Sequence, residues 1–176
     1  GDGEDRPNEL NLLFQKIKEN PSKTVTANRI KRSEGMIFKL MYEFHKILTY
    51  VFTGKLIKFG NYGCLPKESA VKLVQQASIW SSYSGTLTKV IDNRVSIPSF
   101  RGARYFGPSQ MNLFNLLIHS FSIIAVFKFS VFLRSAIFLV FIYVWKYQIG
   151  FLPFILIMLF LCIFNTLILL ISYREN

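Results

Sequence analysis

The feature that most constrains this chain is an uncharged apolar run near its C-terminus, from Phe151 to Ile171. About 20 helical residues are needed to cross the roughly 30 Å of hydrocarbon in a bilayer. The run therefore predicts a transmembrane helix. Pro153 lies in its first turn, where a missing N–H group costs little. Tyr173 and Arg174 then give the run a polar end.

A second apolar span, Ser130 to Tyr147, precedes this run and has Arg134 near its start. Arg134 can extend its side chain to one membrane interface, while Trp145 and Tyr147 suit the other. The residues from Gln148 to Gly150 are too few for anything but a tight hairpin. Two crossings would return the C-terminus to the side from which the chain entered.

Residues 111–127 are mostly apolar with polar side chains interspersed. One helical face collects Leu113, Leu116, Leu117, Ser120, Ile123, Ile124 and Phe127. This pattern predicts an amphipathic helix that lies in the membrane interface and leads into the first crossing. The predicted organisation is therefore a soluble part at 1–110, an interfacial helix at 111–129 and a transmembrane hairpin at 130–176.

Helix and strand patterns alternate along the first 110 residues, which predicts an α/β sheet covered by helices. Strands are expected at 23–28, 55–62 and 94–98, and helices at 8–20, from Ser33 to Val51 and at 66–76. A sheet of so few strands is hard to close alone, and the chain opens at Gly1 with no element before it. We therefore expect a piece of a longer protein.

The soluble part is basic. Of the 21 Lys and Arg residues, 17 precede Met111, against 9 of the 10 acidic residues. Such a domain beside a bilayer is drawn to anionic headgroups or to phosphate-bearing ligands. A second interpretation is a charge bias that only sets topology, with the basic side cytoplasmic. No nucleic-acid-binding motif is present, and Cys64 and Cys162 lie in different regions, which gives no disulfide framework.

Three short groups of charged residues could carry chemistry. Asp2, Glu4 and Asp5 could hold Mg²⁺ or Mn²⁺, or could be a solvated N-terminus that stabilises the next helix. Arg29, Lys31 and Arg32 lie between an expected strand and a helix N-terminus, where phosphate groups bind. Arg101 and Arg104 precede the interfacial helix, and could bind one lipid phosphate or attach the chain to anionic lipid in general. His45 and His119 have no partner in sequence and are interpreted as residues of polar helix faces.

Four segments, taken in order, resemble the family 2 glycosyltransferases that act on polyprenyl phosphates, the dolichyl-phosphate mannose synthase-like group. Gly1 to Leu10 resembles the passage around the family's Asp-x-Asp metal motif with its first Asp missing. Val25 to Gly35 resembles the strand and basic turn that follow, and Phe59 to Leu65 the Gly-Asn/Asp-Phe segment near the acceptor site. Ile97 to Asn112 is the closest match, to two arginines and a Gly-x-Ser-Lys-Met sequence before an interfacial helix and two transmembrane helices.

The resemblance implies part of a GT-A type catalytic domain that transfers a sugar from a nucleotide-sugar donor to a polyprenyl phosphate or a related cell-envelope glycan. It implies a Mg or Mn cofactor and a multi-pass protein of the inner (plasma) membrane, with its catalytic part cytoplasmic. Homo-oligomerisation is left open. The implied roles are Asp2 for the metal, Arg29 and Arg32 for the donor diphosphate, Arg101, Arg104 and Ser109 for the acceptor phosphate, and Asn61 for the acceptor-site loop.

This chain departs from the family pattern in three places. The nucleotide-binding strands and the first metal Asp are missing, so the chain alone is not expected to be active. Lys58 stands near the place of a proposed family base, which leaves the catalytic base unassigned. Gln110 replaces the usual Lys. The alternative function is a non-catalytic two-helix membrane subunit whose basic cytoplasmic domain docks a partner or lipid.

Overall fold

The computed structural model describes residues 4–31, 36–100, 102, 105 and 112–173, and within them it is a mixed α/β structure with mostly helices. One sheet contains the three strands of these residues: β1 (Thr24–Lys31), β2 (Phe59–Cys64) and β3 (Arg94–Phe100). Their order is β2-β1-β3, so β1 is the central strand. β1 pairs antiparallel with β2 and parallel with β3, so that Thr24 lies opposite Arg94 and Lys31 opposite Phe100.

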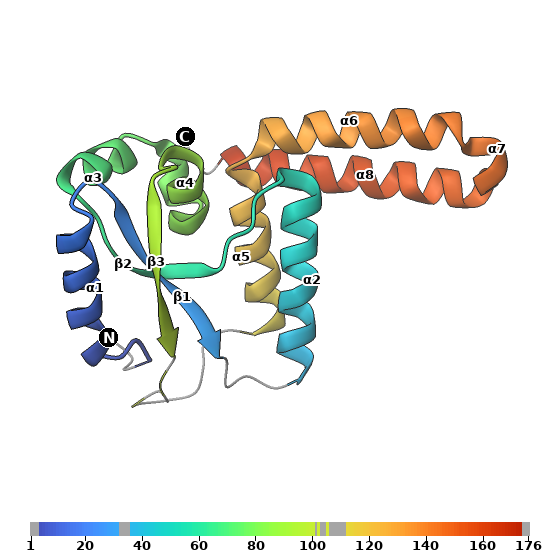
Figure 1. The fold of residues 1–176 in the computed structure, drawn as a ribbon. Helices are drawn as coiled ribbons and strands as arrows, with labels where there is room; N and C mark the ends of the chain where they lie inside the picture. The colour runs from blue at the N-terminus through green and yellow to red at the C-terminus, as the bar shows by residue number, and fades with distance from the viewer. Residues whose placement is uncertain (1–3, 32–35, 101, 103–104, 106–111, 174–176) are drawn as a thin grey trace.

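Helix α1 (Asn8–Glu19) packs on the sheet through alternate residues of the strands (Figure 1). Leu13 of α1 is buried with Val25 and Ala27 of β1 and Ile97 of β3. Because successive strand side chains point to opposite faces, Val25 and Ala27 face α1 together. The short helices α3 (Lys67–Val74), η1 (Ala77–Trp80) and α4 (Tyr83–Val90) follow β2, and their cluster of Leu73, Leu87 and Ile91 packs against Phe59.

The remaining helices form a second apolar core beside the sheet. They are α2 (Met36–Thr53), α5 (Leu113–Ala125), α6 (Lys128–Val144) and α8 (Phe151–Ser172), with the short α7 (Lys146–Ile149) joining the last two. The buried members of this core are Phe52, Ile124, Ala125, Val131, Leu161, Phe164 and Ile168. α6 and α8 run antiparallel and extend away from the sheet, whereas α2 and α5 cross the base of this pair (Figure 1).

Among the described helices, α8 alone is long and apolar enough to cross a membrane by itself, with 22 residues and a mean hydropathy of 3.0. Only 17% of its most apolar stretch is buried, unlike the core helix of a soluble protein. α5 and α6 reach that standard only when taken together, and the chain bends by 91° between them. With 17 residues, α6 is about 25 Å long, which is shorter than a typical hydrocarbon layer.

The predicted interfacial segment at 111–129 is helical in α5, which ends at Ala125 before the turn at Val126 and Phe127. The far end of the hairpin is rich in exposed aromatic residues: Phe141, Tyr143, Trp145, Tyr147 and Phe151. Lys146 lies there over the rings of Tyr143, at 4.3 Å, and Tyr147, at 5.0 Å. Aromatic rings with a cation are typical of a membrane–water interface.

Candidate functional site

The candidate site is the end of the sheet at which β1 and β3 have their C-terminal residues, and we call it the candidate edge. Lys31 and Phe100 lie opposite each other, so the segments 32–35 and 101–111 start from the same edge. Ligands of open α/β sheets bind beyond the carboxyl ends of parallel strands. Both basic groups predicted from the sequence belong to these strand ends and segments. Arg32, Arg101, Arg104 and Ser109 themselves lie outside the described residues, as does Asp2.

The acidic N-terminal segment is hydrogen-bonded to this edge. The backbone N–H of Gly102 donates to the carbonyl oxygen of Glu4, at 2.8 Å. The carboxylate of Glu9 accepts from the hydroxyl of Ser99, at 2.7 Å, and from the backbone N–H of Phe100, at 2.8 Å. Glu9 is 7% exposed and Ser99 is 3% exposed. The first of these contacts places Gly102 beside Glu4, one of the acidic residues that the sequence associates with a metal.

Glu9 was not singled out from the sequence. An acidic residue in the first turn of a helix ordinarily stabilises the helix dipole, and its position in α1 gives that signal alone. Its hydrogen bonds to Ser99 and Phe100 join residues 90 and 91 positions apart in the chain. Glu9 therefore fixes the end of β3 rather than binding a ligand.

Tyr62 of β2 adds a third contact to the N-terminal segment. Its hydroxyl donates to the carbonyl oxygen of Arg6, at 3.2 Å. Burial raises the pKa of Tyr62, and the negative charges of Glu9 and Asp5 raise it further. The phenol therefore stays protonated and remains a donor. Asn61, the predicted acceptor-loop residue, precedes Tyr62 on the same strand and is exposed.

Arg29 is the one predicted phosphate-binding arginine that the structure describes. Its backbone N–H donates to the carbonyl oxygen of Lys58, at 3.3 Å. Its guanidinium lies against Gly60, where a Cβ atom would stand 2.7 Å from the Nη2 nitrogen. Glycine at this position therefore allows the side chain to approach β2. The structure brings Arg29 to the strand that carries Asn61, two residues that the sequence assigned to different substrates.

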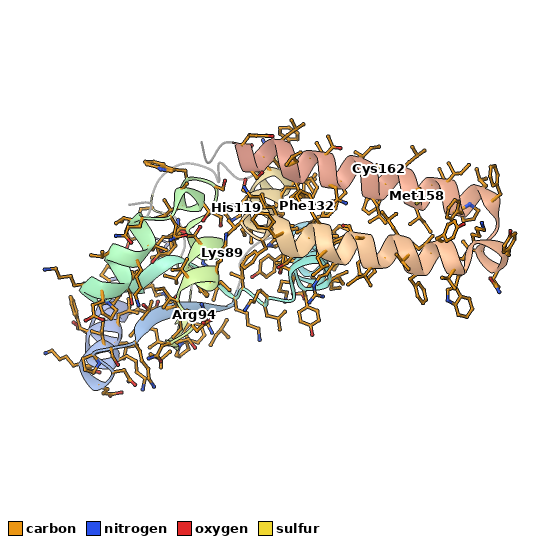
Figure 2. All side chains as sticks on the ribbon, turned by 90° about the horizontal axis from the view of Figure 1, so that it is seen from above. Lys89, Arg94, His119, Phe132, Met158 and Cys162 are labelled. Atoms are coloured by element: carbon orange, nitrogen blue, oxygen red, sulfur yellow. The ribbon has the colours of Figure 1, made fainter. Side chains whose placement is uncertain are left out.

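His119 of α5 was interpreted from the sequence as an ordinary polar residue. In the structure burial lowers the pKa of its imidazole, and the positive charge of Arg29 lowers it further. Figure 2 places His119 on the body of the molecule, away from Met158 and Cys162 of the hairpin. Ninety residues separate the two side chains in the chain, so no spacing rule could have paired them. His45 instead contacts Thr49 within α2, at 3.3 Å.

Two basic residues near the sheet have structural partners instead. The guanidinium of Arg94 donates to the carbonyl oxygens of Leu87, Thr88 and Ile91 at the C-terminal end of α4. The ammonium of Lys89 donates to the carbonyl oxygen of Val126 in the turn between α5 and α6, at 3.1 Å. Cations at helix C-termini are stabilised by the helix dipole. Both residues therefore hold helices in place, and Figure 2 shows them on the body of the molecule.

Helix α2 exposes an apolar stripe. Leu40, Phe44, Ile47 and Val51 recur at helical spacing and are 70%, 54%, 61% and 37% exposed. Leu48 of the same helix instead packs against the second core. The stripe runs along a helix that crosses the base of the hairpin (Figure 1). Contiguous exposed apolar surface is typical of a membrane or protein contact.

Within residues 4–31, 36–100, 102, 105 and 112–173, no three His, Cys, Asp or Glu side chains come together in a way that could hold a metal ion. Asp2, the predicted ligand, is outside these ranges. Comparisons with models of known families, with curated proteins and with solved structures give no match.

Proposed function

We propose that this chain belongs to a membrane-bound glycosyltransferase of GT-A type, which moves a sugar from a nucleotide-sugar donor to a polyprenyl phosphate or a related cell-envelope glycan acceptor. The observation that carries the proposal is the shared edge of β1 and β3. The two basic segments begin there from paired residues, Lys31 and Phe100. The acidic N-terminal segment is hydrogen-bonded to the same edge through Glu4 and Glu9. This arrangement supports the proposal because ligands of open α/β sheets bind beyond the carboxyl ends of parallel strands.

Two helix N-termini strengthen the preference of this edge for anions. α2 begins after the 32–35 segment, and α5 begins after the 101–111 segment. The α5 terminus is capped by Asn112, whose Oδ1 accepts from the backbone N–H of Asn115 at 2.8 Å. Helix N-termini carry partial positive charge and N–H groups that point toward an anion. A substrate with two or more phosphate groups fits this arrangement.

The proposed roles are those that the family resemblance implies. Arg29 and Arg32 bind the donor diphosphate, while Arg101, Arg104 and Ser109 bind the acceptor phosphate. Arg guanidinium groups suit both tasks because they bind phosphate oxygens bidentately. Asn61 lies on the acceptor side. The catalytic base stays unassigned.

Asp2 is the proposed ligand of Mg²⁺ or Mn²⁺. The same segment carries the carboxylates of Glu4 and Asp5, and carboxylate oxygens are the ligands that these hard cations prefer. Glu9 is not proposed as a metal ligand, because its oxygens accept hydrogen bonds from Ser99 and Phe100. When bound, the metal would neutralise negative charge on the leaving diphosphate.

The proposed location is the inner (plasma) membrane, with the sheet on the cytoplasmic side and the hairpin of α6 and α8 in the bilayer. The apolar α8, the aromatic end of the hairpin and the α2 stripe support this arrangement. With the hairpin along the membrane normal, α5 would lie in the membrane plane because of the 91° bend. The candidate edge would then be at headgroup depth, where a lipid phosphate is found.

The test is a transfer assay with the full-length protein in liposomes, a panel of nucleotide sugars and a polyprenyl phosphate. We expect one donor to give a labelled lipid product in the presence of Mg²⁺ or Mn²⁺. Arg29→Ala should reduce the transfer rate about 10- to 100-fold, since a charged hydrogen bond contributes about 1.5–3 kcal/mol. Lys16→Ala is the matched control, because Lys16 is an exposed base paired with Glu19 on α1.

Calorimetry with the same nucleotide sugars separates this proposal from its alternative. An enzyme binds one of them, and Arg29→Ala weakens that binding. A protein that binds vesicles of anionic lipid but no nucleotide sugar would instead be the docking subunit considered above.

A further inference from the structure

The C-terminal end of α2 forms a contact with the hairpin that neither the sequence patterns nor the proposed reaction account for. α2 ends at Thr53 and is followed by Gly54, whose φ is +72° and whose backbone N–H donates to the carbonyl oxygen of Tyr50, at 2.8 Å. A glycine in the left-handed region is the usual residue after a helix C-terminus. The hydroxyl of Thr53 donates to Thr49 and accepts from the backbone N–H of Lys55, which fixes the end of the helix further.

Arg134 of α6 reaches this helix end. Its Nη1 donates to the carbonyl oxygen of Val51, at 3.1 Å. Its Nη2 and Cζ atoms would lie 2.6 Å and 3.4 Å from a Cβ atom on Gly54. Gly54 thus serves two purposes, because it turns the chain and leaves room for the guanidinium. The last carbonyls of a helix carry partial negative charge, which stabilises a cation placed there.

An arginine in α6 needs such a partner. Apart from Lys128 and Arg134, the only residues of α6 with polar groups are Ser130, Ser135 and Tyr143. A charge in a membrane helix is costly unless it is paired. The contact with Val51 joins residues 83 positions apart. It ties the base of the hairpin to the helix that follows β1 in the chain. α2 has 18 residues and is therefore about 27 Å long.

We propose that Arg134 is a positioning residue, which locks α6 to the C-terminal end of α2 and so fixes the angle between the membrane hairpin and the sheet. The inference rests on the proposed function for one consequence only: the lock sets where the candidate edge meets a membrane-embedded acceptor. Arg134 touches no substrate. Its loss should therefore affect use of the lipid acceptor and leave donor binding unchanged.

The lock is tested without activity, by spin-label distances in liposomes. One label replaces Ile47 on α2 and the other Ile137 on α6, two residues that are 61% and 58% exposed. Cys64 and Cys162 are replaced by Ser so that only the introduced cysteines react. We expect a single narrow distance distribution in the parent protein. Arg134→Gln should broaden it, whereas Arg134→Lys should keep it narrower because an ammonium still donates to a carbonyl.

Gly54→Ala provides a second, independent variant. A Cβ atom there would displace the guanidinium, so the distribution should broaden with Arg134 unchanged. Lys146→Gln is the matched control, because it removes a hairpin cation at the far end, away from α2. Narrow distributions in both Arg134→Gln and Gly54→Ala would overturn the proposal, since the contact would then not hold the two helices.

The kinetic arm tests the consequence. In the transfer assay, Arg134→Gln should raise the KM for the lipid acceptor about tenfold and leave the KM for the nucleotide sugar unchanged. A broadened distribution with an unchanged acceptor KM would overturn the positioning role. If the parent protein transfers no sugar, the proposed function has failed. The distance measurement still decides the lock in that case.

Discussion

Glu9 is buried although it is a carboxylate, because both of its oxygens accept hydrogen bonds from the end of β3. Removal of one partner of a buried charged group leaves the others unsatisfied. Arg29 and Gly60 form another such contact, because the missing Cβ atom of Gly60 leaves room for the guanidinium of Arg29. At this scale the sequence predicted the residues with recognisable types and positions, such as Arg29. It could not predict Glu9 or His119, whose partners are distant in the chain.

Glu9→Ala is predicted to lower the free energy of unfolding by about 3 kcal/mol. The change removes two charge-assisted hydrogen bonds, which contribute about 1.5–3 kcal/mol each when buried, and relaxation recovers part of the loss. Thermal denaturation of the detergent-solubilised protein, followed by near-ultraviolet circular dichroism, measures it. Glu19→Ala is the control, because Glu19 is an exposed partner of Lys16 and should cost less than about 1 kcal/mol. Equal effects of the two changes would contradict the role given to Glu9.

Because of Tyr62, the stability of the folded protein should depend on pH in the alkaline range. Its pKa is raised in the folded protein by burial and by Glu9 and Asp5, so the unfolded chain releases this proton first as the pH rises. The stabilisation is complete below the ordinary tyrosine pKa of 10 and is lost as the pH rises through the folded value. Tyr62→Phe, which cannot ionise, should therefore show a smaller loss of stability above pH 10 than the parent. Parallel stability curves for the two proteins would rule this out.

Some helices and strands have a local sequence pattern that predicts them, and others do not. The three strands were predicted near their observed positions, although β2 begins at Phe59 rather than Lys55. α4 and η1 were not predicted, because their Ser and Thr residues are weak helix formers. Side-chain hydrogen bonds hold them instead. Ser82 caps α4 by accepting from the backbone N–H of Gly85, the hydroxyl of Thr86 donates to Ser78, and Arg94 covers the other end.

The packing of α4 on the bend of α5 gives an element-scale prediction. A Cβ atom on Gly85 would lie 3.1 Å from Val126 and 3.3 Å from the carbonyl oxygen of Ile123. Gly85→Leu should therefore separate the two helices and lower the free energy of unfolding by about 1–3 kcal/mol, the usual cost of overpacking. Ala77→Leu, at an exposed residue of η1, is the control. A Gly85→Leu protein as stable as the parent would show that α4 does not pack tightly here.

At the scale of the whole molecule, the described residues form four buried apolar clusters, and two of these differ in kind. The sheet and α1 form one core, while α2, α5, α6 and α8 form another that continues into the exposed hairpin. The sequence predicted this division from the uneven placement of charge. It also predicted two crossings, whereas the structure has one helix that meets the length for a crossing alone. A helix in the membrane plane that leads into a crossing requires a sharp turn, and α5 and α6 meet at 91°. Lys89 contacts the turn between them at Val126.

Topology is the prediction at this scale. If α6 and α8 cross the bilayer together, the tip is on the side opposite the sheet. Tyr147→Cys, at an 86% exposed residue of the tip, should react with a membrane-impermeant thiol reagent added outside intact cells. Lys58→Cys, at an exposed residue before β2, should react only after the membrane is opened. Labelling of both sites only in opened cells would show that the hairpin enters the bilayer and turns back within it.

Because of the 91° bend between α5 and α6, the thickness of the bilayer should affect the position of the candidate edge. α8 has 22 residues and is about 33 Å long, so it should tilt in a hydrocarbon layer thinner than this. Only Val126 and Phe127 separate α5 from α6, and Lys89 holds that turn to α4. A tilt of the hairpin should therefore turn α5 within the membrane surface, and with it the segment that leads from β3. We expect the protein to work best in lipids of one chain length and to lose acceptor use in thinner membranes, in proportion to the tilt.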